Sequence, residues 1–130
     1  NYRLPNLNAA VGCGQLERLV DLLARKARLA ERYREAFQST PGLRVVKSPE
    51  GCRSNHWLNA IVLDQDRQDM RDIILDEAGQ AGFPLRPLWT PMHLLPMYAD
   101  CPRADLAVAE SLHRRVVTRP SSPSLGSADD

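Results

Sequence analysis

Residues 57–63, Trp-Leu-Asn-Ala-Ile-Val-Leu, decide the predicted fold. The run of Ile61, Val62 and Leu63 at the end of this stretch is apolar and largely β-branched, as expected for a buried strand. Shorter strands are predicted before and after it in the chain, at residues 43–47, 85–89 and 116–117. Because all of these segments are short, we expect a small sheet.

Helices are predicted around these strands, at residues 5–19, 20–38, 66–82 and 105–115. The second follows a clear amphipathic pattern, and the apolar residues that recur at helical spacing are Leu16, Leu19, Leu23, Ala27, Ala30 and Phe37. Asp66 is expected to cap the third helix. Residues 90–102, rich in Pro and Met, are expected to form an ordered loop or short helical turns. This order predicts an α+β fold, with a short few-stranded sheet and helices packed on one face.

Two glycines, Gly12 and Gly14, interrupt the first predicted helix. A glycine inside a helix costs about 1 kcal/mol relative to alanine, and it often marks the close approach of another backbone. The sequence leaves two partners open: a helix of the same domain, or a second subunit or a domain outside this sequence.

The composition is that of an ordinary globular protein. The 130 residues suit one domain, 43% are hydrophobic and the net charge is +1. Such a balance produces no strong field, so we expect neither a nucleic-acid nor a membrane partner. The three cysteines, Cys13, Cys52 and Cys101, are not spaced as metal ligands. We therefore expect reduced thiols in a cytoplasmic protein without a metal site.

Polar side chains crowd the first residues of the chain, namely Asn1, Arg3, Asn6 and Asn8. Free N–H groups at a helix start, together with a guanidinium and amides, form a plausible phosphate site. The alternative is helix capping by asparagine, which composition alone favours. Because no methionine begins the chain and its densest polar patch lies at residue 1, we expect a piece of a larger protein, cut beside a functional site.

Two further stretches carry possible site residues. In Ser54-Asn55-His56-Trp57, His56 either lines a site or only satisfies a backbone carbonyl. In residues 86–93, prolines stiffen the backbone around Arg86, Trp89 and His93. Arg and His suit a phosphate, and Trp offers a stacking face, whereas the plain alternative is a buried Trp beside a surface Arg. No catalytic constellation, glycine-rich phosphate loop or nucleophile elbow is complete, so no catalytic residue is predicted.

Taken together, these motifs resemble the DegT/DnrJ-type sugar aminotransferases, in the LegC-like branch. The resemblance runs from residue 1 to about Ser122, and the stretches that carry it are Asn1-Tyr2-Arg3-Leu4-Pro5-Asn6-Leu7-Asn8-Ala9-Ala10, Arg53-Ser54-Asn55-His56-Trp57, Arg86-Pro87-Leu88-Trp89-Thr90-Pro91-Met92-His93 and Pro120-Ser121-Ser122. The resemblance implies the small C-terminal domain of the aspartate-aminotransferase fold. The corresponding organisation is a dimer helix with the cofactor motif at 1–19, a small domain at 20–119 and a flexible tail at 120–130.

The implied enzyme uses pyridoxal 5'-phosphate to move an amino group from glutamate to a keto sugar on a nucleoside diphosphate, for surface polysaccharides. It is a homodimer in which the residue matching Asn1 reaches the cofactor phosphate of the other subunit, with Arg3 beside it. His93 matches a family segment that lies near the sugar nucleotide. Arg86 and Trp89 are expected to contact the sugar nucleotide as well, because they are close to His93 in the sequence.

The chain departs from the family in two respects. Neither Lys26 nor Lys47 matches the Schiff-base lysine, so we expect the chain alone to be inactive. Arg119 stands where the family usually has an apolar residue. The alternatives are a non-catalytic dimerising module, which Gly12 and Gly14 favour, and a nucleotide-sugar-binding module derived from the same family.

Overall fold

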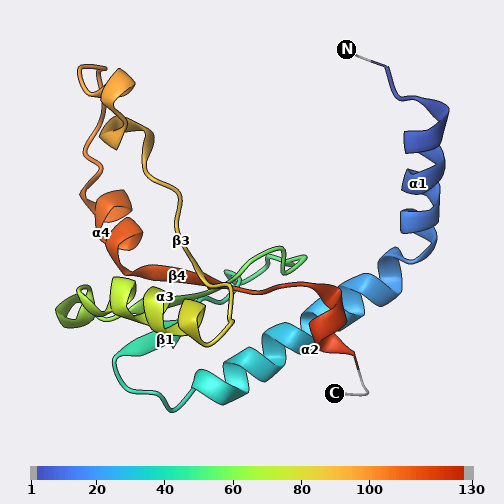
Figure 1. Ribbon diagram of the computed structural model, residues 1–130, viewed down its shortest axis with the longest axis horizontal. Coiled ribbons are helices and arrows are strands. Elements are labelled where there is room, and N and C mark those ends of the chain that lie inside the picture. The colour runs from blue at the N-terminus through green and yellow to red at the C-terminus, as the bar shows by residue number, and fades with distance from the viewer. Residues whose placement is uncertain (1–2, 128–130) are drawn as a thin grey trace.

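The structure is a computed structural model that describes residues 3–127 of the chain (Figure 1). The predicted α+β class is confirmed, with strands that are mostly shorter than expected. In chain order the elements are α1 (Asn6–Glu17), α2 (Leu19–Phe37), β1 (Leu43–Val45), β2 (Asn59–Leu63), η1 (Gln65–Arg67), α3 (Met70–Gln80), β3 (Arg86–Pro87), η2 (Met92–Leu94), η3 (Pro96–Tyr98), α4 (Ala107–Arg115), β4 (Val116–Arg119) and η4 (Pro123–Gly126).

The four strands form one antiparallel sheet in the order β1-β2-β4-β3. The last strand in sequence, β4, therefore lies inside the sheet, between β2 and β3. Val45, Ile61 and Val117 form one row across it. Val117 has no exposed surface, and every residue of β4 is buried. The apolar stretch that decided the prediction thus pairs with the most buried strand of the molecule.

Helix α2 lies against the face of the sheet that carries Ile61, Val117 and Arg119. Alternate residues of a strand share a face, and Arg119 stacks over aromatic rings of α2. Leu29 and Ala30 are the buried residues of this helix. The sequence pattern identified Ala30 but not Leu29. Residues of the opposite face, such as Val62 and Val116, are buried as well.

The start of the third helix differs from the prediction. Asp66 does not cap it, because residues 65–67 form the separate short helix η1, and α3 begins only at Met70. The amide of Arg67 donates to the carbonyl of Asp64, which closes η1 first. The predicted short helical turns in residues 90–102 are confirmed as η2 and η3.

Residues 120–127 pack against α2, in contrast to the frayed tail that was expected there. Four side chains of α2 donate hydrogen bonds to backbone carbonyls of this segment, and they are Lys26 to Ser121, Arg28 to Gly126, Arg32 to Leu125 and Tyr33 to Pro120. A Cβ added at Gly126 would lie 2.1 Å from the carbonyl oxygen of Arg25. The polar composition of this segment predicted a frayed tail. The segment binds α2 through its backbone carbonyls, which composition does not reveal.

Helix α1 projects away from the rest of the molecule (Figure 1). None of its residues is buried. Among residues 3–127, nothing lies within 4 Å of a Cβ built on Gly12 or Gly14, so the same-domain partner for these glycines is wrong. Within the described residues, no helix has both the length and the apolar character needed to span a bilayer.

Candidate functional site

Strand β3 and the segment after it position Arg86 and Trp89. Arg86 pairs with Thr118 in the sheet, and its carbonyl accepts a hydrogen bond of 3.0 Å from the Thr118 hydroxyl. The backbone of Arg86 is therefore fixed from two sides, while the residue remains exposed. Its guanidinium is available to a ligand, as a phosphate-binding role requires.

The rings of Trp57 and Trp89 lie together on the surface. Their centroids are 6.3 Å apart with the planes tilted by 32°, within the range of favourable aromatic pairs. Both are exposed, Trp57 at 66% and Trp89 at 70%. The plain alternative of a buried Trp89 is therefore wrong. The structure brings together the two stretches that the sequence singled out, although it was His56, rather than Trp57, that was considered there.

His93 faces α4. Its Nε2 lies 2.9 Å from Oε1 of Glu110, and its side chain is only 10% exposed. One ring nitrogen is thus occupied by a residue of the same chain. The ring also borders a cavity of about 390 Å³, between η2 and the start of α4, that Tyr98 and Leu106 line as well. His93 therefore links η2 to α4 through Glu110.

The cofactor-binding candidates lie elsewhere. Asn1 lies outside the described residues. Arg3 is exposed and lies just before α1, and Figure 1 shows α1 on the opposite side of the molecule from α4. Within one chain, the structure does not bring Arg3 near Arg86, Trp89 or His93.

Neither lysine is placed in a recognisable cofactor site. Lys26 is half-buried, and its amine donates to the Ser121 carbonyl beside η4. Burial lowers the pKa of Lys26 from its ordinary value. Lys47 is exposed in the segment after β1.

Arg119 is the residue whose role the sequence left unexplained. It is only 5% exposed, and its guanidinium lies 4.1 Å from the ring centroid of Tyr33 and 4.7 Å from that of Phe37. None of its three side-chain nitrogens has a hydrogen-bond acceptor among the described residues. Burial lowers the pKa of Arg119, and attraction to Tyr33 opposes this shift. At this position, where the family usually has an apolar residue, the chain thus has a buried cation whose guanidinium lies over two aromatic rings of α2.

Comparison with known proteins agrees with this architecture. The profile of the DegT/DnrJ/EryC1/StrS aminotransferases matches residues 1–130. The chain belongs to this aminotransferase family. GDP-perosamine synthase of Vibrio cholerae is 34% identical over 126 residues, which cover 96% of this chain and 34% of that protein. The chain therefore spans about a third of the length of that relative.

Solved aminotransferase structures contain the same fold. A family member from Brucella abortus is 30% identical and superposes with a TM-score of 0.81 over 98% of this chain and 33% of its own. DesV of S. venezuelae, solved in complex with a ketimine intermediate, is 28% identical with a TM-score of 0.81, covering 95% of this chain and 33% of its own. The resemblance to sugar aminotransferases that the motifs indicated is confirmed.

Proposed function

We propose that this chain is the small C-terminal domain of a cytoplasmic, homodimeric aminotransferase that uses pyridoxal 5'-phosphate. The complete enzyme transfers an amino group from glutamate to a nucleoside-diphosphate keto sugar for surface polysaccharides. Family membership and the GDP-perosamine synthase relative support the substrate class. The observation that carries the proposal is the exposed Trp57–Trp89 pair at the segment after β3.

In this proposal the aromatic pair contacts the base or sugar of the substrate, because exposed tryptophan faces stack on such rings. Arg86 pairs with the diphosphate through its free guanidinium. His93, whose Nε2 contacts Glu110, positions the segment that follows Trp89. It does not bind the substrate through Nε2. This assignment revises the role expected for His93 from the family motif and retains those of Arg86 and Trp89.

Asn1 and Arg3 remain proposed ligands of the cofactor phosphate of a second subunit. The exposed position of Arg3 on the projecting N-terminal arm supports a contact with a partner. Because Lys26 donates to a backbone carbonyl and Lys47 is an exposed residue of the segment after β1, this chain by itself is proposed to be inactive. The cofactor, when bound, supplies the electron sink for transamination, and the covalent link comes from a residue outside this sequence.

The test is a kinetic assay of a full-length protein that carries this sequence, with 2-oxoglutarate release from glutamate as the readout. Trp89→Ala is expected to raise the KM for the sugar nucleotide at least about tenfold, since base or sugar stacking is lost. The KM for glutamate should stay within twofold. Equal losses for both substrates, or no loss in KM for the sugar, would count against the assignment.

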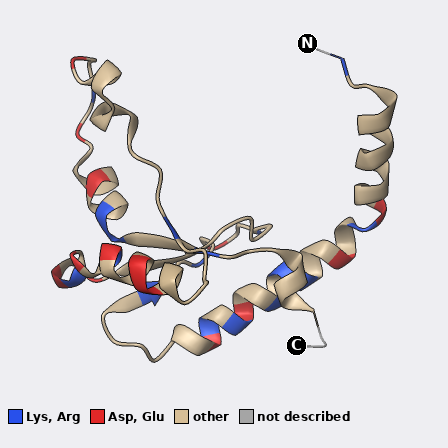
Figure 2. Cartoon of the chain, viewed as in Figure 1, with Lys and Arg blue, Asp and Glu red and all other residues tan. Residues whose placement is uncertain are grey.

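A non-catalytic dimerising module is the second candidate, and the surface of α1 favours it. Leu7, Val11 and Leu16 are between 58% and 75% exposed, and the helix carries no charged residue before Glu17 (Figure 2). Sedimentation of the 130-residue chain distinguishes the candidates. A dimer that Leu7→Glu converts to monomer, in a chain without nucleotide binding, would favour this module over the substrate-binding domain.

A further inference from the structure

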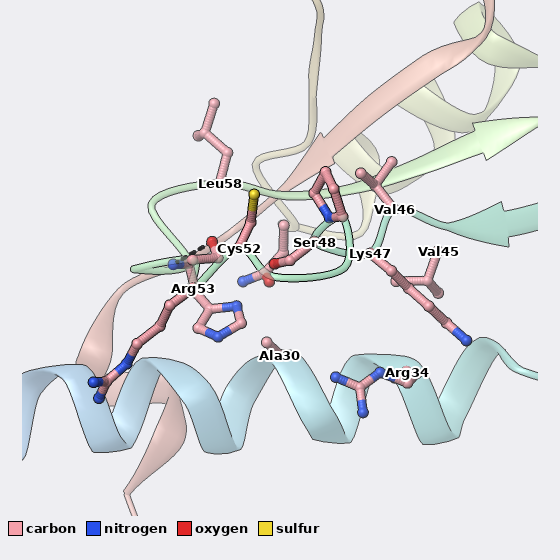
Figure 3. A pocket seen from close by; sticks show the side chains of 13 residues that line it. Ala30, Arg34, Val45, Val46, Lys47, Ser48, Cys52, Arg53 and Leu58 are labelled. Carbon is pink, nitrogen blue, oxygen red and sulfur yellow. Dashed lines mark hydrogen bonds between the residues drawn. The ribbon is translucent and has the colours of Figure 1, made fainter.

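A second candidate site lies away from the Trp57–Trp89 pair. A pocket of about 510 Å³ lies between α2 and the segment that joins β1 to β2 (Figure 3). Arg34 borders it from α2, whereas Lys47 and Arg53 border it from the joining segment. In Figure 3 the side chains of Lys47 and Arg53 run toward α2 on either side of Ala30. Four different parts of the chain, α2, β1, the joining segment and β2, thus enclose one space.

The charge of this pocket has one sign. Three cationic side chains and His56 line it, and none of its lining residues in the described part of the chain is acidic. Two acids are close by: Glu31 pairs with Arg34 on the same helix, and Glu50 lies in the joining segment between the lining residues Pro49 and Cys52. Lys47 and Arg53 form no ion pair within residues 3–127. A pocket with this surplus of cations attracts anions.

A buried amide among the residues that line the pocket gives an independent observation. Asn59 lines the pocket and is only 7% exposed. Its Nδ2 is buried and has no hydrogen-bond acceptor among the described residues. Its direct partner in the sheet is Arg119, whose guanidinium nitrogens also lack acceptors there. Buried donors without acceptors are rare in folded proteins, and a bound acceptor removes the deficit.

The joining segment holds its side chains in a defined conformation. The amide of His56 donates to the Ser54 hydroxyl, and the amide of Trp57 donates to the Asn55 side-chain oxygen. His56 itself has a φ of 52°, a backbone conformation unusual for a residue other than glycine. His56 is one of the residues that line the pocket.

The space continues along α2 into a second pocket of about 710 Å³. The two pockets share Arg53 and His56, and the helix side of the second is apolar, with Val20, Leu23 and Ala27. A ligand with an anionic end and a less polar body fits the cationic first pocket and the apolar second pocket together better than a free inorganic ion does.

We propose that this pocket binds the phosphate or diphosphate group of a small molecule. Arg34, Lys47 and Arg53 supply positive charge, Asn59 supplies a buried donor, and His56 borders both pockets. The guanidinium and amide donors match oxyanion acceptors, whereas a metal cation would find no acidic ligand among the described lining residues. The proposal is independent of the aminotransferase assignment, because it rests on the pocket alone.

The test is calorimetric titration of the 130-residue chain with inorganic pyrophosphate and, separately, with GDP. Lys47→Gln combined with Arg53→Gln is expected to weaken binding of inorganic pyrophosphate at least about tenfold, because two charge-assisted contacts are lost. Binding of GDP should weaken as much when the compared chains all carry Arg86→Gln, which removes the contact proposed for the diphosphate at the tryptophan pair. The matched control is Arg44→Gln combined with Arg103→Gln, which removes the same charge from residues outside the pocket. All four side chains are exposed, so circular dichroism should show folded variants.

Tighter binding of GDP than of pyrophosphate identifies a phosphate ester with an organic body, and equal binding identifies the anion alone. A third variant, Asn59→Leu, should leave the chain folded, since it removes an unpaired donor, yet weaken binding at least about threefold. The proposal is overturned if neither probe binds at millimolar concentration, or if the control pair weakens binding as much as the pocket pair does.

Discussion

His93 Nε2 lies 2.9 Å from Glu110 Oε1, and this contact ties η2 to α4. The contact spans 17 residues of sequence, so it joins the segment after β3 to the helix that leads into β4. His93, which the family resemblance implied to be a substrate ligand, thus has a contact partner in its own chain.

If this contact stabilises the fold, the effects of replacing the two side chains on the free energy of unfolding should not be additive. His93→Ala and Glu110→Ala should each lower the free energy of unfolding by about 1 kcal/mol, and the double variant should lose less than the sum. Urea denaturation measures all three. Arg114→Ala is the control, since Arg114 lies 3.8 Å from the other Glu110 oxygen at an exposed position. Strict additivity of the two losses would contradict the coupling.

Gly126 should tolerate no larger residue. A Cβ there meets the Arg25 carbonyl at 2.1 Å, and neither backbone moves without disturbing η4 on α2. We expect Gly126→Ala to lower the free energy of unfolding by about 1–3 kcal/mol. Gly79→Ala in α3 is the matched control, because nothing lies within 4 Å of its Cβ. It should stabilise the protein by about 0.5–1 kcal/mol, and a loss in both variants would refute the close approach.

Arg119 should cost stability in the absence of a ligand. The guanidinium is buried without acceptors among the described residues, and its contacts with Tyr33 and Phe37 only partly offset the desolvation. Replacing it with an apolar residue, Arg119→Leu, is expected to raise the free energy of unfolding by about 1 kcal/mol in phosphate-free buffer. A drop of similar size would show that the stacked cation stabilises the fold.

Pyridoxal phosphate should not become covalently attached at a specific site in this chain. Lys26 donates to the Ser121 carbonyl, and Lys47 is an exposed side chain at the border of the pocket between α2 and the joining segment, so neither amine is enclosed by a pocket. After incubation with one equivalent of cofactor and borohydride reduction, mass spectrometry should find only low, scattered labelling. Stoichiometric labelling of one lysine, abolished by Lys26→Met or Lys47→Met, is the outcome at odds with an inactive chain.

Much of the fold follows from local patterns. The apolar run that ends in Leu63, the glycine and proline stops, and the Pro- and Met-rich segment predicted the elements, because backbone preference acts over a few residues. Packing between distant segments was less predictable. Leu29 fell outside the expected stripe, and residues 120–127 attach to α2 through carbonyl groups that every sequence contains.

The site was predictable only in part, for the same reason. The sequence singled out Trp89 and the Ser-Asn-His-Trp stretch separately, but the contact of Trp57 with Trp89 crosses 32 residues and depends on the sheet order. The pocket of Arg34, Lys47 and Arg53 gave no motif, since its members come from different elements. The sequence did contain one signal near this pocket. Arg119, the sheet partner of Asn59, is charged at a position where the family usually has an apolar residue.

Tryptophan fluorescence tests the central claim most directly, because Trp57 and Trp89 are the two tryptophans of the chain. Titration of the 130-residue chain with a GDP-linked hexose should change the emission saturably. Arg86→Gln should weaken this binding several-fold, whereas Lys47→Gln with Arg53→Gln, in the other pocket, should leave it within twofold. An emission that does not change up to millimolar sugar nucleotide, or a response indifferent to Arg86, would contradict a sugar-nucleotide site at the tryptophan pair.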